Sequence, residues 1–135
     1  MAEQQVQVNL VVQVQGRSVT ATLTFRNASG QDAFIERVNA CDGGRIRNDL
    51  FEITKDDQRV PYIGRLAKRA APGPEDFIKL APGQSLSNTV QLESVYAFPP
   101  GAGTYKIRYS AYNPFPDRDG FFELVSNEVV FTLKE

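Results

Sequence analysis

Three cationic side chains gather within five residues, close to an aromatic ring. Arg65, Lys68 and Arg69 follow Tyr62 in the run PYIGRLAKRAAPGPED. Guanidinium and ammonium groups in such a cluster bind a phosphate, a carboxylate or an acidic groove of a protein. A basic loop is also commonly just a solvated surface, and two acidic residues at the end of this run nearly neutralise it. These four residues are the candidate partner-binding site.

A second group of side chains has the chemistry of a calcium site. Asp117 and Asp119 stand in the sequence DRDG, and Glu123 follows closely enough to add a third carboxylate. Calcium prefers oxygen ligands of this kind. An EF-hand loop needs more widely spaced oxygens, however, and proline followed by an Asp-Gly tip is also how a β-sandwich builds a turn. The three residues are weak metal candidates, and we expect no metal or other cofactor.

The chain lacks the side chains on which most enzymes depend. It contains no histidine, which is the commonest general base and transition-metal ligand. Cys41 is the single cysteine, so it can form no disulfide within the chain and would lack a histidine partner as a nucleophile. We expect Cys41 to be a packing residue or an incidental surface residue, and the protein not to be an enzyme.

Size and charge narrow the classes of partner. With 135 residues the chain is expected to form one domain over residues 1–135. Its 15 basic and 16 acidic residues give a net charge of −1, which provides no field to attract nucleic acid. No run of about 18 apolar residues is present, so no membrane span is expected.

The segments that position these residues alternate apolar and polar side chains with a period of two. The clearest strands cover residues 6–14, 19–25, 86–92, 103–111 and 127–133. Turns rich in Gly, Pro and Asn separate them, and no segment has a convincing helical period. The pattern predicts an all-β protein, an immunoglobulin-like antiparallel β-sandwich of seven to eight strands.

Several single residues carry finer expectations. Pro61 limits its strand to a sheet edge, and residues 64–76 form the longest irregular and most exposed segment. Tyr105 is either a tyrosine corner, with its hydroxyl bonded to nearby backbone, or an ordinary strand tyrosine. Six aromatic residues in or next to loops are interface anchors or plugs of the core; they are Tyr96, Phe98, Tyr112, Phe115, Phe121 and Phe122.

The runs PYIGRLAKRAAPGPEDFIKLAPGQSL, LFEITKDDQRVPY and GTYKIRYSA resemble a known domain. It is the N-terminal or pro-region β-sandwich of bacterial zinc peptidases of the deuterolysin and peptidyl-Lys metalloendopeptidase type, here without the catalytic domain. The resemblance implies that the chain covers a peptidase cleft, assists peptidase folding or binds another protein. It also implies a secreted or periplasmic location, whereas a native start at Met1 would imply the cytoplasm.

The favoured interpretation is therefore a non-catalytic protein-binding module, a peptidase-associated pro-domain or an inhibitor of a zinc endopeptidase. The alternative is a structural or adhesive immunoglobulin-like domain without inhibitory activity, with calcium at the Asp117 turn as a stabilising ion. A carbohydrate-binding module would need a flat row of exposed aromatic residues, and the sequence has no Trp. The chain is expected to be a monomer or a weak homo-oligomer.

Overall fold

The structure is a computed structural model that describes residues 6–66 and 72–134. Within these residues it has ten β-strands and three short 3-10 helices, and none of its helices could cross a membrane. The strands are β1 (Val6–Gln15), β2 (Ser18–Asn27), β3 (Ala33–Glu36), β4 (Phe51–Lys55), β5 (Gln58–Arg59), β6 (Phe77–Leu80), β7 (Ser85–Gln91), β8 (Gly103–Pro114), β9 (Phe121–Val125) and β10 (Val129–Leu133). The 3-10 helices are η1 (Asp42–Gly44), η2 (Pro74–Asp76) and η3 (Leu92–Ser94).

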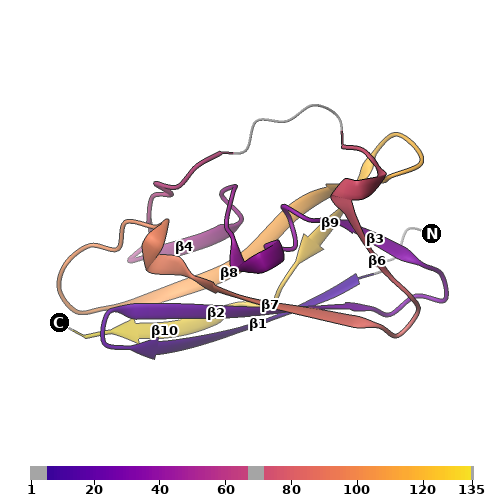
Figure 1. The fold of residues 1–135 in the computed structure, drawn as a ribbon. Helices are drawn as coiled ribbons and strands as arrows, with labels where there is room; N and C mark the ends of the chain where they lie inside the picture. The colour runs from indigo at the N-terminus through magenta and orange to yellow at the C-terminus, as the bar shows by residue number, and fades with distance from the viewer. Residues whose placement is uncertain (1–5, 67–71, 135) are drawn as a thin grey trace.

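The predicted all-β, antiparallel architecture is confirmed. One sheet has the strand order β1-β2-β7, the second has the order β10-β8-β4-β5 with β9 paired to the end of β8, and β3 pairs with β6. Figure 1 shows β1, β2 and β7 as one layer, with β10 and β8 passing behind it. The result is a β-sandwich.

Strand β9 was not predicted from the sequence. β8 continues through Pro114 instead of ending near residue 111, and its last five residues pair with β9 in a register that joins Ser110 to Val125 and Pro114 to Phe121. The sequence hid this hairpin because Pro114 lies in a segment rich in turn residues, and because Phe121 and Phe122 interrupt the alternation. The backbone N–H of Phe115 donates to the carbonyl of Gly120 at 3.1 Å and closes the turn.

The inward-facing rows of β2 and β8 form the centre of the core. Leu23 and Phe25 on β2 and Ile107 and Tyr109 on β8 are fully buried. Phe25 packs edge-on against Tyr109, with the ring centroids 5.6 Å apart. Each such side chain contributes about 1.5–3 kcal/mol by leaving water, so the alternation seen in the sequence is what holds the two layers together.

Tyr105 is a buried strand tyrosine and not a tyrosine corner. Its ring stacks on Phe131 at 5.3 Å, and its buried hydroxyl has no hydrogen-bond partner among the described residues. Two other tyrosines bond through their hydroxyls to backbone groups that are distant in the sequence. The Tyr109 hydroxyl donates to the carbonyl of Asn39 at 2.5 Å, and the Tyr96 hydroxyl accepts from the N–H of Phe51 at 3.0 Å.

Asn88, which breaks the apolar row of β7, has a specific role. Its side-chain amide donates to the carbonyl of Ala40 at 2.7 Å, and it thereby attaches the loop of residues 39–48 to β7. Cys41 lies in this loop and is fully buried, which is the packing alternative of the two expected from the sequence. Burial raises the pKa of its thiol from 9.0 to about 12, so Cys41 is a packed thiol and not a reactive one.

Candidate functional site

The segment that carries Tyr62 is fixed to the sandwich by backbone pairing. Tyr62 forms an antiparallel bridge with Tyr96, which lies two residues after the end of η3. The N–H of Ile63 donates to the carbonyl of Val95 at 2.7 Å, and the N–H of Ala97 donates to the carbonyl of Pro61 at 3.0 Å. β5, the strand that precedes Pro61, is the last strand of its sheet, as predicted. The irregular segment therefore begins from backbone that is paired with residues 95–97.

The Tyr62 side chain closes a tight turn next to this paired backbone. Its half-buried ring packs edge-on against Tyr96, and its hydroxyl donates to the carbonyl of Arg65. Gly64 is enclosed by this turn, because a Cβ atom at that position would lie 2.7 Å from the Tyr62 hydroxyl and 2.8 Å from Cγ1 of Val95. The conformation of residues 62–65 is thus set by packing that no larger residue at position 64 would allow.

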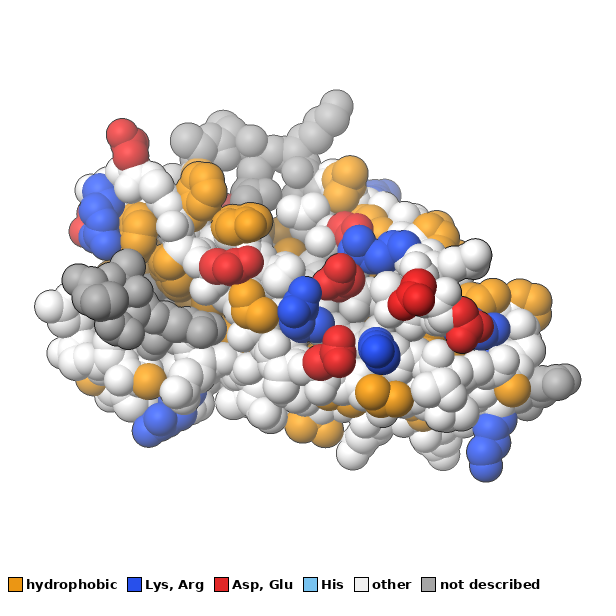
Figure 2. All heavy atoms as spheres, turned by 180° about the vertical axis from the view of Figure 1, so that it is seen from behind, with side chains coloured by type: hydrophobic (Ala, Val, Ile, Leu, Met, Phe, Trp, Pro, Cys, Tyr) orange, Lys and Arg blue, Asp and Glu red, His pale blue; other side chains and the backbone are white. Residues whose placement is uncertain are grey.

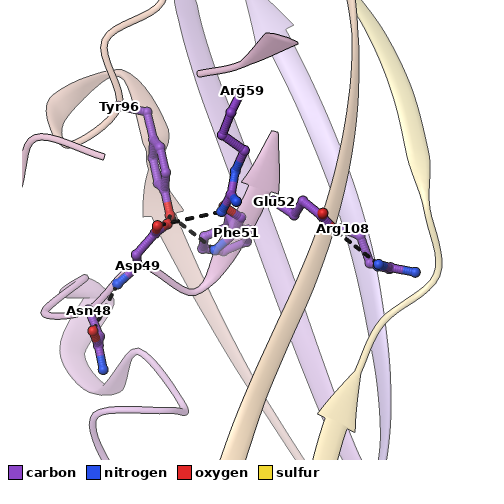
Figure 3. A network of polar contacts seen from close by, with 7 residues as sticks. All are labelled: Asn48, Asp49, Phe51, Glu52, Arg59, Tyr96 and Arg108. Atoms are coloured by element: carbon purple, nitrogen blue, oxygen red, sulfur yellow. Dashed lines mark hydrogen bonds and ion pairs between the residues drawn. The ribbon is translucent and has the colours of Figure 1, made fainter. Parts of the chain in front are cut away.

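Below the turn, Tyr96 is held by a polar network that links three parts of the chain (Figure 3). Its hydroxyl donates to Oδ1 of Asp49 at 2.8 Å and accepts from the N–H of Phe51. Oδ2 of Asp49 forms an ion pair with Arg59 of β5 at 3.4 Å. Burial, and next to it the Asp49 carboxylate, hold the pKa of Tyr96 far above its usual range, so the hydroxyl stays protonated and keeps donating.

Of the two alternatives for Tyr96, interface anchor or plug of the core, the structure shows the plug. The polar roles of Asp49 and Tyr96 were not predicted. Tyr96 is buried because the bridge to Tyr62 brings it under the turn. Periodicity reports contacts between neighbouring strands, whereas this pairing joins residues 34 positions apart outside any regular strand. Two others of the six aromatic residues, Tyr112 on β8 and Phe121 on β9, are exposed, and their rings contact each other edge-on with the centroids 5.8 Å apart.

The turn presents apolar side chains to solvent on either side of a cation. Ile63 is 63% exposed and Leu66 is 64% exposed, and Arg65 lies between them. We call residues 63–66 the exposed turn. Lys68 and Arg69, the other two predicted binding residues, lie outside the described residues. Of the predicted site, the structure therefore brings together Tyr62 and Arg65, through the bond between the Tyr62 hydroxyl and the Arg65 carbonyl.

A hollow of about 360 Å³ adjoins the same backbone pairing. Lys55, Asp56 and Arg59 line it from the β4–β5 hairpin, and Pro61 and Pro99 lie on its apolar wall. The hollow has room for one side chain, and its lining carries two cationic groups and one carboxylate.

The predicted metal candidates do not converge. Asp117 and Asp119 lie in the solvent-exposed loop between β8 and β9, where Asp117 forms an ion pair with Arg118 at 3.4 Å. Glu123 is on β9, opposite Tyr112. Among residues 6–66 and 72–134, no group of three or more His, Cys, Asp or Glu side chains is arranged to hold a metal ion.

The opposite side of the molecule from the view of Figure 1 carries acidic and basic side chains mixed over its central part (Figure 2). On the outer face of β4 and β8, Glu52 and Arg108 form an ion pair at 2.8 Å with both side chains nearly half exposed. Exposed pairs of this kind contribute at most about 1 kcal/mol. Opposite charges therefore largely neutralise each other at this pair.

No family model matches the sequence. A stretch of 60 residues, 44% of the chain, is 42% identical to part of an extracellular protease of Aeromonas hydrophila. That stretch covers 17% of the protease. The chain is thus similar to a region of that protein and spans only a small part of its length.

Proposed function

We propose that this chain is a non-catalytic protein-binding module, a pro-domain or an inhibitor of a zinc endopeptidase, that docks through the exposed turn. The observation that carries the proposal is the exposed turn itself, with Ile63 and Leu66 open to solvent next to the Tyr62–Tyr96 bridge. The likeness to part of an extracellular protease supports a peptidase as the partner. The resemblance to the accessory region of deuterolysin-type peptidases supports the same choice.

The build of the exposed turn suits tight docking. Binding costs free energy for each side chain and backbone segment that must be ordered. The bond from Tyr62 to the Arg65 carbonyl and the enclosed Gly64 fix the turn before any partner arrives. Apolar side chains held in this way can fill pockets of a partner at little entropic cost.

The charges of the segment suit an acidic cleft. Arg65, Lys68 and Arg69 lie within five residues of one another in the sequence, and Pro72 and Pro74 restrict the chain that follows. For a peptidase that selects lysine, Lys68 would act as the substrate mimic in the specificity pocket. Arg65 would then pair with acidic groups at the rim of the cleft, which steers association and depends on salt.

The chain's own chemistry supports a binding role. The sequence has no histidine to act as general base or zinc ligand. Cys41 is buried, with its thiol pKa raised to about 12 by burial, which keeps it from acting as a nucleophile. Binding at the exposed turn needs none of these groups.

The test is inhibition of a panel of zinc endopeptidases, including a lysine-selective one, with mass analysis of the chain afterwards. We expect saturable inhibition by an intact chain. The double variant Ile63→Ser/Leu66→Ser and the variant Lys68→Ala should each weaken inhibition at least about tenfold, equal to ~1.4 kcal/mol of binding. Val130→Ser is the matched control, because Val130 is 59% exposed on β10, remote in the sequence from the turn.

Two outcomes would contradict the proposal. If no peptidase of the panel is inhibited, or if the Val130 variant is as weak as the double variant, docking does not use the exposed turn. If the peptidase instead cuts cleanly within residues 64–76, the basic run is a processing site and the sandwich is a passive neighbour of the peptidase.

A further inference from the structure

One edge of the sandwich is closed over only part of its length. Along the first half of β1, Val8 forms a parallel bridge with Ser126. Next to it, Oδ1 of Asn127 accepts from the N–H of Leu10 at 2.8 Å, and Nδ2 of Asn127 donates to the carbonyl of Leu10 at 3.1 Å. The Asn127 side chain thus occupies both outward backbone groups of Leu10.

The second half of β1 has backbone groups of the same orientation without such a cover. In an antiparallel pair, every second residue directs both its N–H and its C=O away from the neighbouring strand. Because Leu10 does so, Val12 and Val14 do so as well. β10 lies close to β1, and Arg17 after the end of β1 donates to the carbonyl of Lys134. Within the part of the chain that the structure describes, however, no hydrogen bond joins β10 to these four groups, and β1 pairs there only with β2.

The side chains around these groups are open to solvent. Val11 is 47% exposed and Val14 is 36% exposed, and Gln13 and Gln15 are also exposed. This stretch has none of the charged or proline residues that usually protect a free edge. By contrast, η1 packs against the β7 edge, and β5 is two residues long and is followed within two residues by Pro61.

We infer that residues 11–15 of β1 form a pairing edge for a second copy of this chain. An antiparallel pair with its two-fold axis at Gln13 places Val12 opposite Val14 of the other copy, and the reverse. The two N–H and two C=O groups of each copy then satisfy one another in four hydrogen bonds. The register is self-complementary, as a two-fold interface requires.

The same register determines which residues lie next to each other at the two-fold axis of the dimer. Gln13 lies opposite Gln13 of the second copy in a pair that makes no backbone hydrogen bonds, where the Cα atoms are about 4.5 Å apart. Two amides tolerate this position, and two like charges would not. With only five residues paired per copy, the dimer is weak, with a dissociation constant of about 10 µM to 1 mM.

Sedimentation equilibrium over a range of concentrations tests the inference. The average mass should rise above the 15.0 kDa of one chain and approach twice that value. Gln13→Lys and Gln13→Glu should each stay monomeric, and an equal mixture of the two should dimerise again because opposite charges then meet at the axis. Asn9→Lys is the control on the same face of β1, beside the edge that Asn127 closes, and should dimerise like the parent chain.

A second variant tests the same pairing without a charged residue, in case the charge at position 13 prevents folding. Gln13→Cys should form a disulfide between two copies under mild oxidation, since about 4.5 Å lies within the Cα separation that a disulfide spans. Asn9→Cys should not, and the buried Cys41 does not interfere. A parent chain that stays monomeric at about 1 mM overturns the inference and leaves the edge to a strand of another protein. A dimer that Gln13→Lys and Asn9→Lys affect equally overturns it too.

Discussion

The ring of Tyr62 packs edge-on against the ring of Tyr96, with the centroids 5.3 Å apart. Tyr62 directly precedes the exposed turn and Tyr96 belongs to the buried polar network, so this contact connects the candidate binding segment to the core. Tyr96 continues the link downward, through Asp49 and Phe51. A substitution of Tyr96 should therefore change both the stability of the protein and the conformation of the exposed turn.

Tyr96→Phe should lower the free energy of unfolding by about 1–3 kcal/mol. The change removes the acceptor of the buried Phe51 N–H and the donor to Asp49, while it keeps the ring. Tyr105→Phe is the matched control, because the Tyr105 hydroxyl is buried without a partner in the described residues. Its loss should cost less than about 0.5 kcal/mol or should stabilise. Urea unfolding of both variants would contradict the assignment if the two losses were equal.

Gly64→Ala should displace the exposed turn. The added Cβ would meet the Tyr62 hydroxyl and the Val95 side chain at less than 3 Å, so the turn must open. We expect a loss of about 1–2 kcal/mol in stability, typical of overpacking, and a loss of inhibition of about tenfold or more. Gly30→Ala serves as control, because nothing lies within 4 Å of a Cβ at that position. Unchanged inhibition by the Gly64 variant would show that the turn's conformation does not matter.

The stability of the chain should fall with pH above about 9. The Cys41 thiol has its pKa raised by burial from 9.0 to about 12, so the unfolded chain loses this proton first as the pH rises. Between these values the folded state binds more protons than the unfolded state, and stability drops by up to ~1.4 kcal/mol per pH unit for one such group. Below pH 9 the thiol contributes no slope.

The contribution of Cys41 can be separated from that of the tyrosines. Burial raises the pKa of Tyr96 and Tyr109 as well, so they add to the fall above about pH 10, where free tyrosine ionises. Cys41→Ala should flatten the dependence between pH 9 and 10 and leave the steeper fall above it. Urea unfolding at each pH measures this, and identical slopes in the two proteins would argue against a buried thiol.

Much of the sandwich is predictable from the sequence, because alternation directly reports which side chains face the core. Leu23 and Ile107 could be placed inward in this way, and both are buried. Tyr96 could not, because its burial depends on a bridge to Tyr62 that no local pattern encodes. The sequence predicted that the exposed turn is irregular and open to solvent. It could not predict that position 64 requires glycine, because this depends on the atoms of Tyr62 and Val95 that pack around it.

Asn88 interrupts the apolar row of β7, and the structure shows why: its side chain bonds to the loop of residues 39–48. Asn88→Ala should cost about 1–2 kcal/mol, because the buried carbonyl of Ala40 loses its donor. The loop of residues 39–48 should then open more often than the whole protein unfolds. Thr89→Ala on the opposite, exposed face of β7 is the control and should cost little.

Cys41 reports this opening directly, because it is the residue next to Ala40 and its thiol is buried. The rate at which a thiol reagent labels Cys41 under native conditions should rise about tenfold or more in Asn88→Ala, for a loss of ~1.4 kcal/mol or more in the free energy of local opening. The same rate should stay near that of the parent chain in Thr89→Ala. Equal labelling in all three proteins would mean that the loop is held by its own packing and that the amide of Asn88 is dispensable.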